Sequence, residues 1–157
     1  MKDHVTKDIK KSAEEEFEIK ILRDGTWLHQ GSPIKRMALV KLFATVLSKD
    51  EDGQHWLKTP VEKGRIDVED SAYVSTSVKR DGSDIRVTSN IDKSYKISKE
   101  FPLIVRDAVP YLEVEKNLEV RIARTHYYDL VKWAEKNKDE IGIKSDGLFF
   151  RLGKAEA

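Results

Sequence analysis

Cysteine is absent from this sequence, and its absence excludes several kinds of site. Without thiols the chain forms no disulfide, holds no iron–sulfur cluster and offers neither a cysteine nucleophile nor a thiolate metal ligand. No apolar run approaches the roughly 18 residues that a membrane-spanning helix needs. The opening stretch MKDHVTKDIKK lacks the apolar segment of a secretory signal. We therefore expect a cytoplasmic protein with no membrane association, no cofactor and no bound metal.

An excess of one charge is also lacking. The 29 lysines and arginines nearly balance the 28 aspartates and glutamates, which leaves a formal net charge of +1. Proteins that bind nucleic acid non-specifically usually carry a clear positive excess. We therefore do not expect a nucleic-acid partner. The 157 residues suit one compact domain or two small ones.

Alternating apolar residues predict strands in the first third of the chain. Phe17, Ile19 and Ile21 alternate with charged residues, and Asp24-Gly25 supplies a tight turn, so a β-hairpin is predicted over residues 17–30. Upstream, an apolar residue recurs every four positions after Thr6. This pattern is compatible with a short amphipathic helix or with a frayed tail.

A helix is predicted after the hairpin. Ser32 is a suitable N-cap and Pro33 suits the first helical position. The helix should run for about four turns and end near Lys49, before an acidic turn. Its expected apolar face consists of Leu39, Leu42, Phe43, Val46 and Leu47.

The second half of the chain shows a similar alternation of strands with one helix. A hairpin is predicted over residues 73–89, around the turn Arg80-Asp81-Gly82. Further short strands lead to a second helix, with Thr125 as its N-cap. The residues expected to line one face of this helix are Tyr127, Leu130, Val131 and Ala134.

The order of elements occurs twice. Ile34-Lys35-Arg36 precedes the first helix, and Ile122-Ala123-Arg124 precedes the second; an Asp-Gly turn and an aromatic strand follow each. These observations favour an α+β fold with mostly antiparallel strands, in which a duplicated strand-helix-strand motif forms two small packed lobes. We place the lobes at residues 16–70 and 71–153, after a polar tail at 1–15.

Lys35 and Arg36 are the most informative local feature. Cations are unfavourable in the first turn of a helix, where free N–H groups and the helix dipole attract anions. Donors, dipole and cations together are typical of sites that hold phosphate or carboxylate. The alternative interpretation is that these side chains turn into solvent or pair with nearby carboxylates, and it is the more common outcome.

Three carboxylates form a second candidate group. Asp67 and Glu69 share one face of a predicted strand, and Glu62 lies nearby in the sequence. Such groups can bind a metal or transfer protons, but charged residues more often mark the solvent face of a half-buried strand. No phosphate-binding loop, dinucleotide fingerprint or zinc-protease motif is present. We therefore name no catalytic residue and lean away from an enzyme.

A family resemblance extends from about Phe17 to the end of the chain. The most specific part is the ordered run from Arg23 to Asp70, which includes Arg23-Asp24-Gly25-Thr26-Trp27, Gly31-Ser32-Pro33-Ile34, Asp50-Glu51-Asp52-Gly53 and Thr59-Pro60-Val61-Glu62-Lys63. Later positions that match are Asn90, Asp92, Ile122-Ala123-Arg124, Tyr128 and Leu130-Val131. The chain resembles a bacterial family, domain of unknown function 1285.

This resemblance implies a duplicated α+β core whose C-terminal half looks like a pleckstrin-homology fold. It also implies a site for a nucleotide-like ligand between the halves, and a part in bacterial signalling or stress response. We expect Ser32, Lys35 and Arg36 to hold an anionic group. The further members of the predicted site are Arg65 and Arg124, which would complete the clamp, and Trp27 or Tyr73, which would contact a base. A protein-interaction module without a small ligand is the alternative, and a carboxylate or metal enzyme is less favoured.

Overall fold

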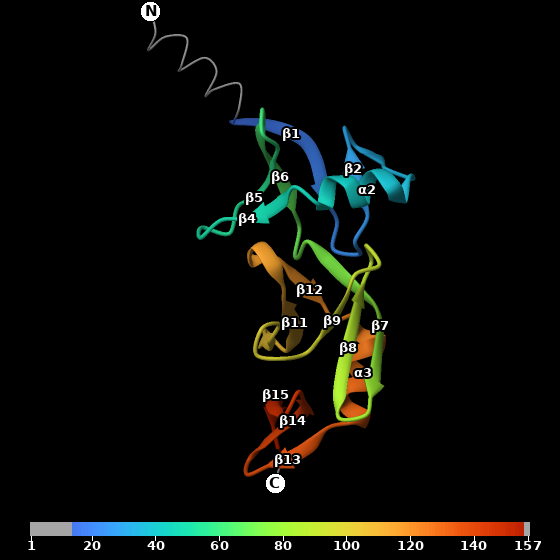
Figure 1. Cartoon of the computed structure of the whole chain (residues 1–157), viewed down its shortest axis with the longest axis vertical. Coiled ribbons are helices and arrows are strands. Elements are labelled where there is room, and N and C mark those ends of the chain that lie inside the picture. The colour runs from blue at the N-terminus through green and yellow to red at the C-terminus, as the bar shows by residue number, and fades with distance from the viewer. Residues whose placement is uncertain (1–13, 156–157) are drawn as a thin grey trace, which may run out of the picture. The chain divides into compact units, whose positions relative to one another are not determined.

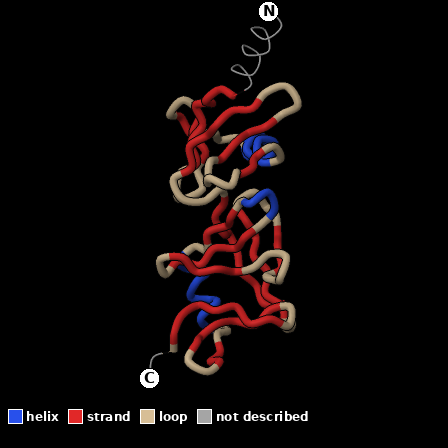
Figure 2. The backbone as a smooth tube through the Cα atoms, turned by 90° about the vertical axis from the view of Figure 1, so that its left-hand side faces the viewer, coloured by secondary structure: helices blue, strands red, loops and turns tan. Residues whose placement is uncertain are grey.

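The computed structural model describes residues 14–155, and the chain divides into two compact units. Unit 1 ends at Asp70 and unit 2 begins at Ser71. Strands predominate in both units, as Figure 2 shows. Within residues 14–155 none of the helices is both long and apolar enough to cross a bilayer. The amphipathic helix considered after Thr6 lies outside the described residues.

The described part of unit 1 consists of two three-stranded antiparallel meanders, and the helix α2 (Met37–Ala44) connects them along the chain (Figure 1). The first meander is β1 (Glu14–Ile21), β2 (Trp27–His29) and β3 (Ser32–Pro33). The second is β4 (Leu47–Lys49), β5 (His55–Lys58) and β6 (Lys63–Val68). Parallel pairing of β1 with β6 joins them into one sheet of order β3-β2-β1-β6-β5-β4.

The hairpin predicted over residues 17–30 is confirmed as β1 and β2. Ile21 is opposite Trp27, and both side chains are buried in the core of unit 1. Gly25 closes the turn with a φ of +95°, a conformation that favours glycine. The burial of alternate side chains along β1 therefore follows from the alternation of apolar and charged residues in the sequence.

The first helix is shorter than predicted and starts later. Ser32 and Pro33 belong to β3, where Ser32 pairs with His29, so their predicted roles as N-cap and first helical residue are wrong. The backbone prefers this ladder with β2 to a helical turn, and the N–H of Ile34 continues it by donating to the carbonyl of Trp27 at 2.8 Å. The N-cap is Arg36, and the helix has eight residues.

The apolar face predicted for this helix is also mostly wrong, because its two buried residues were not among those predicted. Val40 and Ala44 are buried, whereas Leu39 and Leu42 are exposed, Leu42 to 62%. The helix ends at Ala44, where the Thr45 hydroxyl donates to the carbonyl of Leu42 at 2.6 Å. The chain then returns to a strand, so the apolar residues after position 44 do not extend a helical stripe.

Unit 2 repeats the arrangement of meander, helix and meander. Its first meander is β10 (Leu103–Arg106), β11 (Val109–Glu113) and β12 (Glu119–Arg121), with a 3-10 turn, η1 (Glu115–Asn117), before β12. The helix α3 (Arg124–Lys132) follows, and then β13 (Glu135–Asn137), β14 (Glu140–Ser145) and β15 (Leu148–Lys154). Both units thus have a sheet-rich, mostly antiparallel α+β architecture. The order of meander, helix and meander occurs once in each, so the chain contains an internal repeat.

An additional meander precedes this repeat in unit 2. It consists of β7 (Tyr73–Asp81), β8 (Asp84–Ser89) and β9 (Ser94–Lys96), and it confirms the hairpin predicted over residues 73–89. Parallel pairing of β7 with β12 produces a sheet of order β10-β11-β12-β7-β8-β9. The strands β13, β14 and β15 form a separate sheet.

The N-cap predicted for the second helix is wrong. The cap is Ala123, and Thr125 lies inside the first turn of α3. Of the predicted apolar face, Leu130 is fully buried, Val131 is exposed, and Ala134 lies beyond the last helical residue. The hydroxyl of Ser75 on β7 accepts the N–H of Ala123 at 2.8 Å. A side chain distant in the sequence therefore binds the start of this helix in place of a local cap.

Candidate functional site

The pairing of β1 with β6 is interrupted in the middle of the sheet of unit 1. Glu16 is opposite Arg65 and Lys20 is opposite Asp67, so three residues of β1 lie against the single residue Ile66. Extra residues of this kind bend a strand and change the direction of its side chains. Two cavities lie along this irregular stretch, with volumes of about 650 and 460 Å³.

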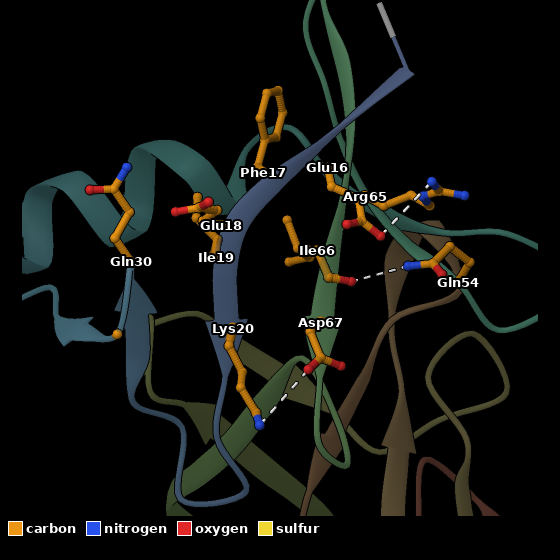
Figure 3. A pocket seen from close by; sticks show the side chains of 11 residues that line it. Glu16, Phe17, Glu18, Ile19, Lys20, Gln30, Gln54, Arg65, Ile66 and Asp67 are labelled. Carbon is orange, nitrogen blue, oxygen red and sulfur yellow. Dashed lines mark hydrogen bonds and ion pairs between the residues drawn. The ribbon is translucent and has the colours of Figure 1, made fainter. Parts of the chain in front are cut away.

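Five of the eleven residues that line the larger cavity are charged, and four of them pair with one another (Figure 3). Arg65 Nη2 lies 3.9 Å from a carboxylate oxygen of Glu16, and Lys20 Nζ lies 3.8 Å from one of Asp67. The side-chain amide of Gln54 donates to the carbonyl of Ile66 at 3.0 Å. The two cations here already have carboxylate partners, so this cavity offers an anionic ligand little uncompensated positive charge.

The smaller cavity is mostly apolar. Its apolar lining comes from Phe17 and Ile19 of β1, Leu57 of β5, Phe43 near the end of α2, and Val46 just after that helix. Carboxylates also line it, and these are Glu16, Glu18 and Glu62. The two cavities therefore differ in chemistry although they share part of β1.

Gly64 determines where the Phe17 ring lies. A Cβ atom at this position would overlap the ring, so we expect Gly64→Ala to lower the unfolding free energy by about 1–3 kcal/mol through overpacking. Urea unfolding of the purified chain measures this loss. Gly153→Ala is the matched control, because a Cβ at that strand position meets no atom within 4 Å. Equal stability of the two variants would contradict this packing.

Three of the predicted site residues lie in one exposed segment of unit 1. Ser32 is on β3, and Lys35 and Arg36 follow it before the start of α2. Within residues 14–155, neither Lys35 nor Arg36 has a carboxylate within ion-pair distance. No side chain caps the first turn of α2, and that turn has no acidic residue. Two unpaired cations thus lie beside free backbone donors.

The two aromatic residues of the predicted site are core residues. Trp27 is 1% exposed and stacks on Phe43, with ring centroids 6.2 Å apart. Tyr73 is 2% exposed on β7, and its burial, with a smaller effect of the Glu115 charge, raises the pKa of its phenol above the usual range. Each ring packs inside its own unit and presents little surface to a base.

The two remaining arginines already have partners. Arg65 pairs with Glu16 and lies 5.9 Å from the centroid of the Trp56 ring. Arg124 is the first residue of α3, and its Nε donates to the hydroxyl of Tyr128 at 3.0 Å, which raises the pKa of its guanidinium. Unit 1 therefore supplies the unpaired cations of the predicted site, and unit 2 supplies a surface arginine that binds its own helix.

The candidate carboxylates fall into two groups. Asp67 and Glu69 each lie 3.8 Å from Lys20 Nζ, and Glu69 also accepts the backbone N–H of Arg23 at 2.8 Å. Glu62 lines the apolar cavity and has no such contact with the residues that the structure describes. No group of three histidine, aspartate or glutamate side chains able to hold a metal occurs in the described part of the chain.

Sequence reasoning missed a partly buried polar pair in unit 2. Ser75 Oγ and His126 Nδ1 lie 2.7 Å apart, although the residues are 51 positions apart in the chain. Because the same hydroxyl accepts the N–H of Ala123, the pair fixes the start of α3 against β7. Four scattered histidines gave no signal for this contact, since it depends on tertiary structure.

The repeated units and their mostly antiparallel sheets define a class of two-unit α+β proteins. Family models named DUF1285, N-terminal domain and C-terminal domain, match residues 9–71 and 72–152. The chain belongs to this family of unknown function, and the resemblance seen in the sequence is confirmed.

Two solved structures of the family are similar to this chain. A DUF1285 family protein from Silicibacter pomeroyi DSS-3 is 33% identical with a TM-score of 0.82, over 89% of this chain and 81% of that one. A DUF1285 family protein from Shewanella baltica OS155 is 27% identical with a TM-score of 0.63, over 74% of this chain and 91% of that one. No curated protein matches the chain.

Proposed function

We propose that this chain is a cytoplasmic ligand-binding protein with a regulatory role in signalling or stress response, and that its ligand is a phosphate-bearing, nucleotide-like molecule. Lys35 and Arg36 hold the anionic group. The observation that carries this proposal is the pair of exposed cations without a carboxylate partner in residues 14–155, beside a helix start that no side chain caps. Ser32 is exposed in the same segment and adds a hydroxyl donor.

The physical basis is the match between this segment and a phosphate. The first N–H groups of α2 lack intrahelical acceptors, and the helix dipole adds partial positive charge at the same end. Arg36 supplies a planar guanidinium that can donate two hydrogen bonds to phosphate oxygens. Trp27 and Tyr73 are left out of the proposed contacts because they form the cores of their units.

A thermal-shift experiment on the whole chain tests this proposal. Nucleotides and cyclic dinucleotides at about 100 times Kd should stabilise the protein by about 2.7 kcal/mol, which raises Tm by a few degrees. Arg36→Ala should abolish the rise. Arg86→Ala is the control, because Arg86, which lies on β8, is exposed like Arg36 and its removal changes the net charge equally. A rise that survives Arg36→Ala would place the anion site elsewhere, and no rise with any probe would count against the proposal.

A protein-interaction module is the second candidate, and one observation favours it. Leu39 and Leu42 lie three positions apart on α2 and are both exposed, a costly arrangement for apolar side chains unless another surface covers them. Capture of one partner protein from a cell extract should then be lost in the double variant Leu39→Ser/Leu42→Ser. Ser94→Ala, an exposed position in unit 2, should leave the capture unchanged.

The finer fold assignment of unit 2 is also a proposal. Its mostly antiparallel sheets and the helix α3 support a relationship to the pleckstrin-homology arrangement. Such sheets often serve as binding surfaces, although fold alone does not define function. A crystal structure of the chain, superposed on pleckstrin-homology domains strand by strand, tests the relationship; a different strand order would contradict it.

A further inference from the structure

We propose that the apolar cavity of about 460 Å³ in unit 1 is a second binding site, and that its ligand has an apolar body and a cationic ammonium head. This site differs in position and in charge from the segment at Lys35 and Arg36. The inference therefore does not rest on the anionic ligand proposed above. Its support is the combination of an apolar interior with unpaired carboxylates at the same cavity.

The interior fits the apolar body of a small ligand. Two phenyl rings and three aliphatic side chains line it, from Phe17, Phe43, Ile19, Val46 and Leu57. Its volume lies within the range of about 300–1,000 Å³ that is usual for small-molecule sites. Burial of a ring or short alkyl chain against these groups supplies the main attraction.

The charges around the cavity determine the sign of the head group. Glu18 and Glu62 line it, and neither has a cationic partner among the residues that the structure describes. Glu16 also lines it but forms an ion pair with Arg65, at a distance of 3.9 Å. Among the described residues no lysine or arginine contributes to the lining of this cavity, and its one imidazole, His29, is exposed on β2. An ammonium group would gain charge-assisted hydrogen bonds here, whereas a carboxylate or phosphate would be repelled.

The aromatic lining adds to this preference. A cation within about 6 Å of a phenyl ring is attracted by the negative face of the ring, and Phe17 and Phe43 both contribute to the cavity. The neighbouring cavity of about 650 Å³ shares Phe17 and Glu18 with this one, but Phe43 and Glu62 do not line it, and its two cations, Lys20 and Arg65, pair with Asp67 and Glu16 (Figure 3). The combination of two phenyl rings with two carboxylates that lack a cationic partner in the described residues therefore occurs at the apolar cavity.

Three probes with the same apolar body separate the contributions of body and charge. They are 4-phenylbutylamine, 4-phenylbutanol and 4-phenylbutyrate, titrated into the isotope-labelled whole chain and followed by amide chemical shifts. We expect the amine to bind about tenfold more tightly than the alcohol, as one charge-assisted hydrogen bond predicts. The carboxylate should bind more weakly than the alcohol. Shifts should concentrate at Phe17, Phe43 and Leu57.

Two variants locate the site. Glu18→Gln/Glu62→Gln should remove the advantage of the amine and leave the affinity for the alcohol unchanged, and nucleotide binding should also be unaffected. Glu51→Gln/Asp52→Asn is the charge-matched control, because both residues are exposed in a turn of the same unit and neither lines the cavity. Val46→Phe should fill the cavity and weaken all three probes, with circular dichroism and Tm confirming that the variant is folded.

Each outcome of these titrations leads to a different conclusion about the cavity. Equal affinities for amine and alcohol would refute the cationic head group, and tighter binding of the carboxylate would reverse the assignment. Amine binding that persists in both the double variant and Val46→Phe would place the site elsewhere. Absence of binding by any probe would overturn the proposal while leaving the nucleotide experiment on Arg36 unaffected.

Discussion

Trp27→Ala is expected to lower the unfolding free energy of unit 1 by about 3–5 kcal/mol, the usual loss for truncation of a buried tryptophan. Trp27 is 1% exposed, pairs across the hairpin with Ile21 and stacks on Phe43 of α2. Its removal leaves a cavity where the sheet and the helix meet. Urea unfolding followed by amide hydrogen exchange in unit 1 measures the loss.

Two further substitutions show whether packing is the cause. Trp27→Phe should cost much less, because a ring remains to stack on Phe43 and the indole N–H of Trp27 has no acceptor among residues 14–155. Trp56→Ala is the comparison in the same unit, since Trp56 is only half-buried and its indole N–H donates to Asp50 at 2.8 Å. If Trp27→Ala kept full stability but lost nucleotide binding, Trp27 would return to the ligand site.

The buried position of Trp27 shows how much of the site the sequence could reveal. An aromatic residue after a turn is compatible with a ligand contact and with a core position, and periodicity does not distinguish them. Trp27 and Tyr73 proved to be core residues, which only the packing of distant strands could show. Lys35 and Arg36 are neighbours in one segment. Their exposure and their lack of carboxylate partners among residues 14–155 therefore agree better with the sequence pattern than the positions of the two aromatic residues do.

Local turn chemistry explains which elements were predicted correctly. The hairpins around Gly25 and Gly82 depend on residues within one turn, and both formed as expected. Ser32 and Pro33 have equally good local chemistry for a helix start, but their backbone pairs with β2. Pairing across the sheet therefore overrode the helix signal.

The cavities of unit 1 depend on long-range structure. They lie where β1 and β6 pair in parallel, with residues near position 18 beside residues near position 66. No local pattern specifies a parallel partner more than 40 residues away or the three-against-one irregularity within it. Glu18 and Glu62 consequently gave no sequence signal as members of one cavity. The same limit applies to the contact of Ser75 with His126.

Ser145→Ala is expected to destabilise unit 2 by about 1–3 kcal/mol for each of two buried groups that lose their partner. The hydroxyl of Ser145, at the end of β14, is fully buried; it accepts the N–H of Ile85 at 2.9 Å and donates to the carbonyl of Ile97 at 2.7 Å. Alanine fills nearly the same volume but leaves both backbone groups unsatisfied. Urea unfolding and hydrogen exchange at the amide of Ile85 measure the effect.

Ser94→Ala is the matched control, because Ser94 is exposed on β9 of the same unit, and it should change stability by less than about 0.5 kcal/mol. Since one hydroxyl bonds groups on β8 and just after β9, its loss should weaken the attachment of the β13-β14-β15 sheet to the larger sheet of unit 2. Exchange should therefore quicken in β14 and β8 together. Faster exchange in β14 alone, with Ile85 still protected, would show that these two hydrogen bonds do not hold the sheets together.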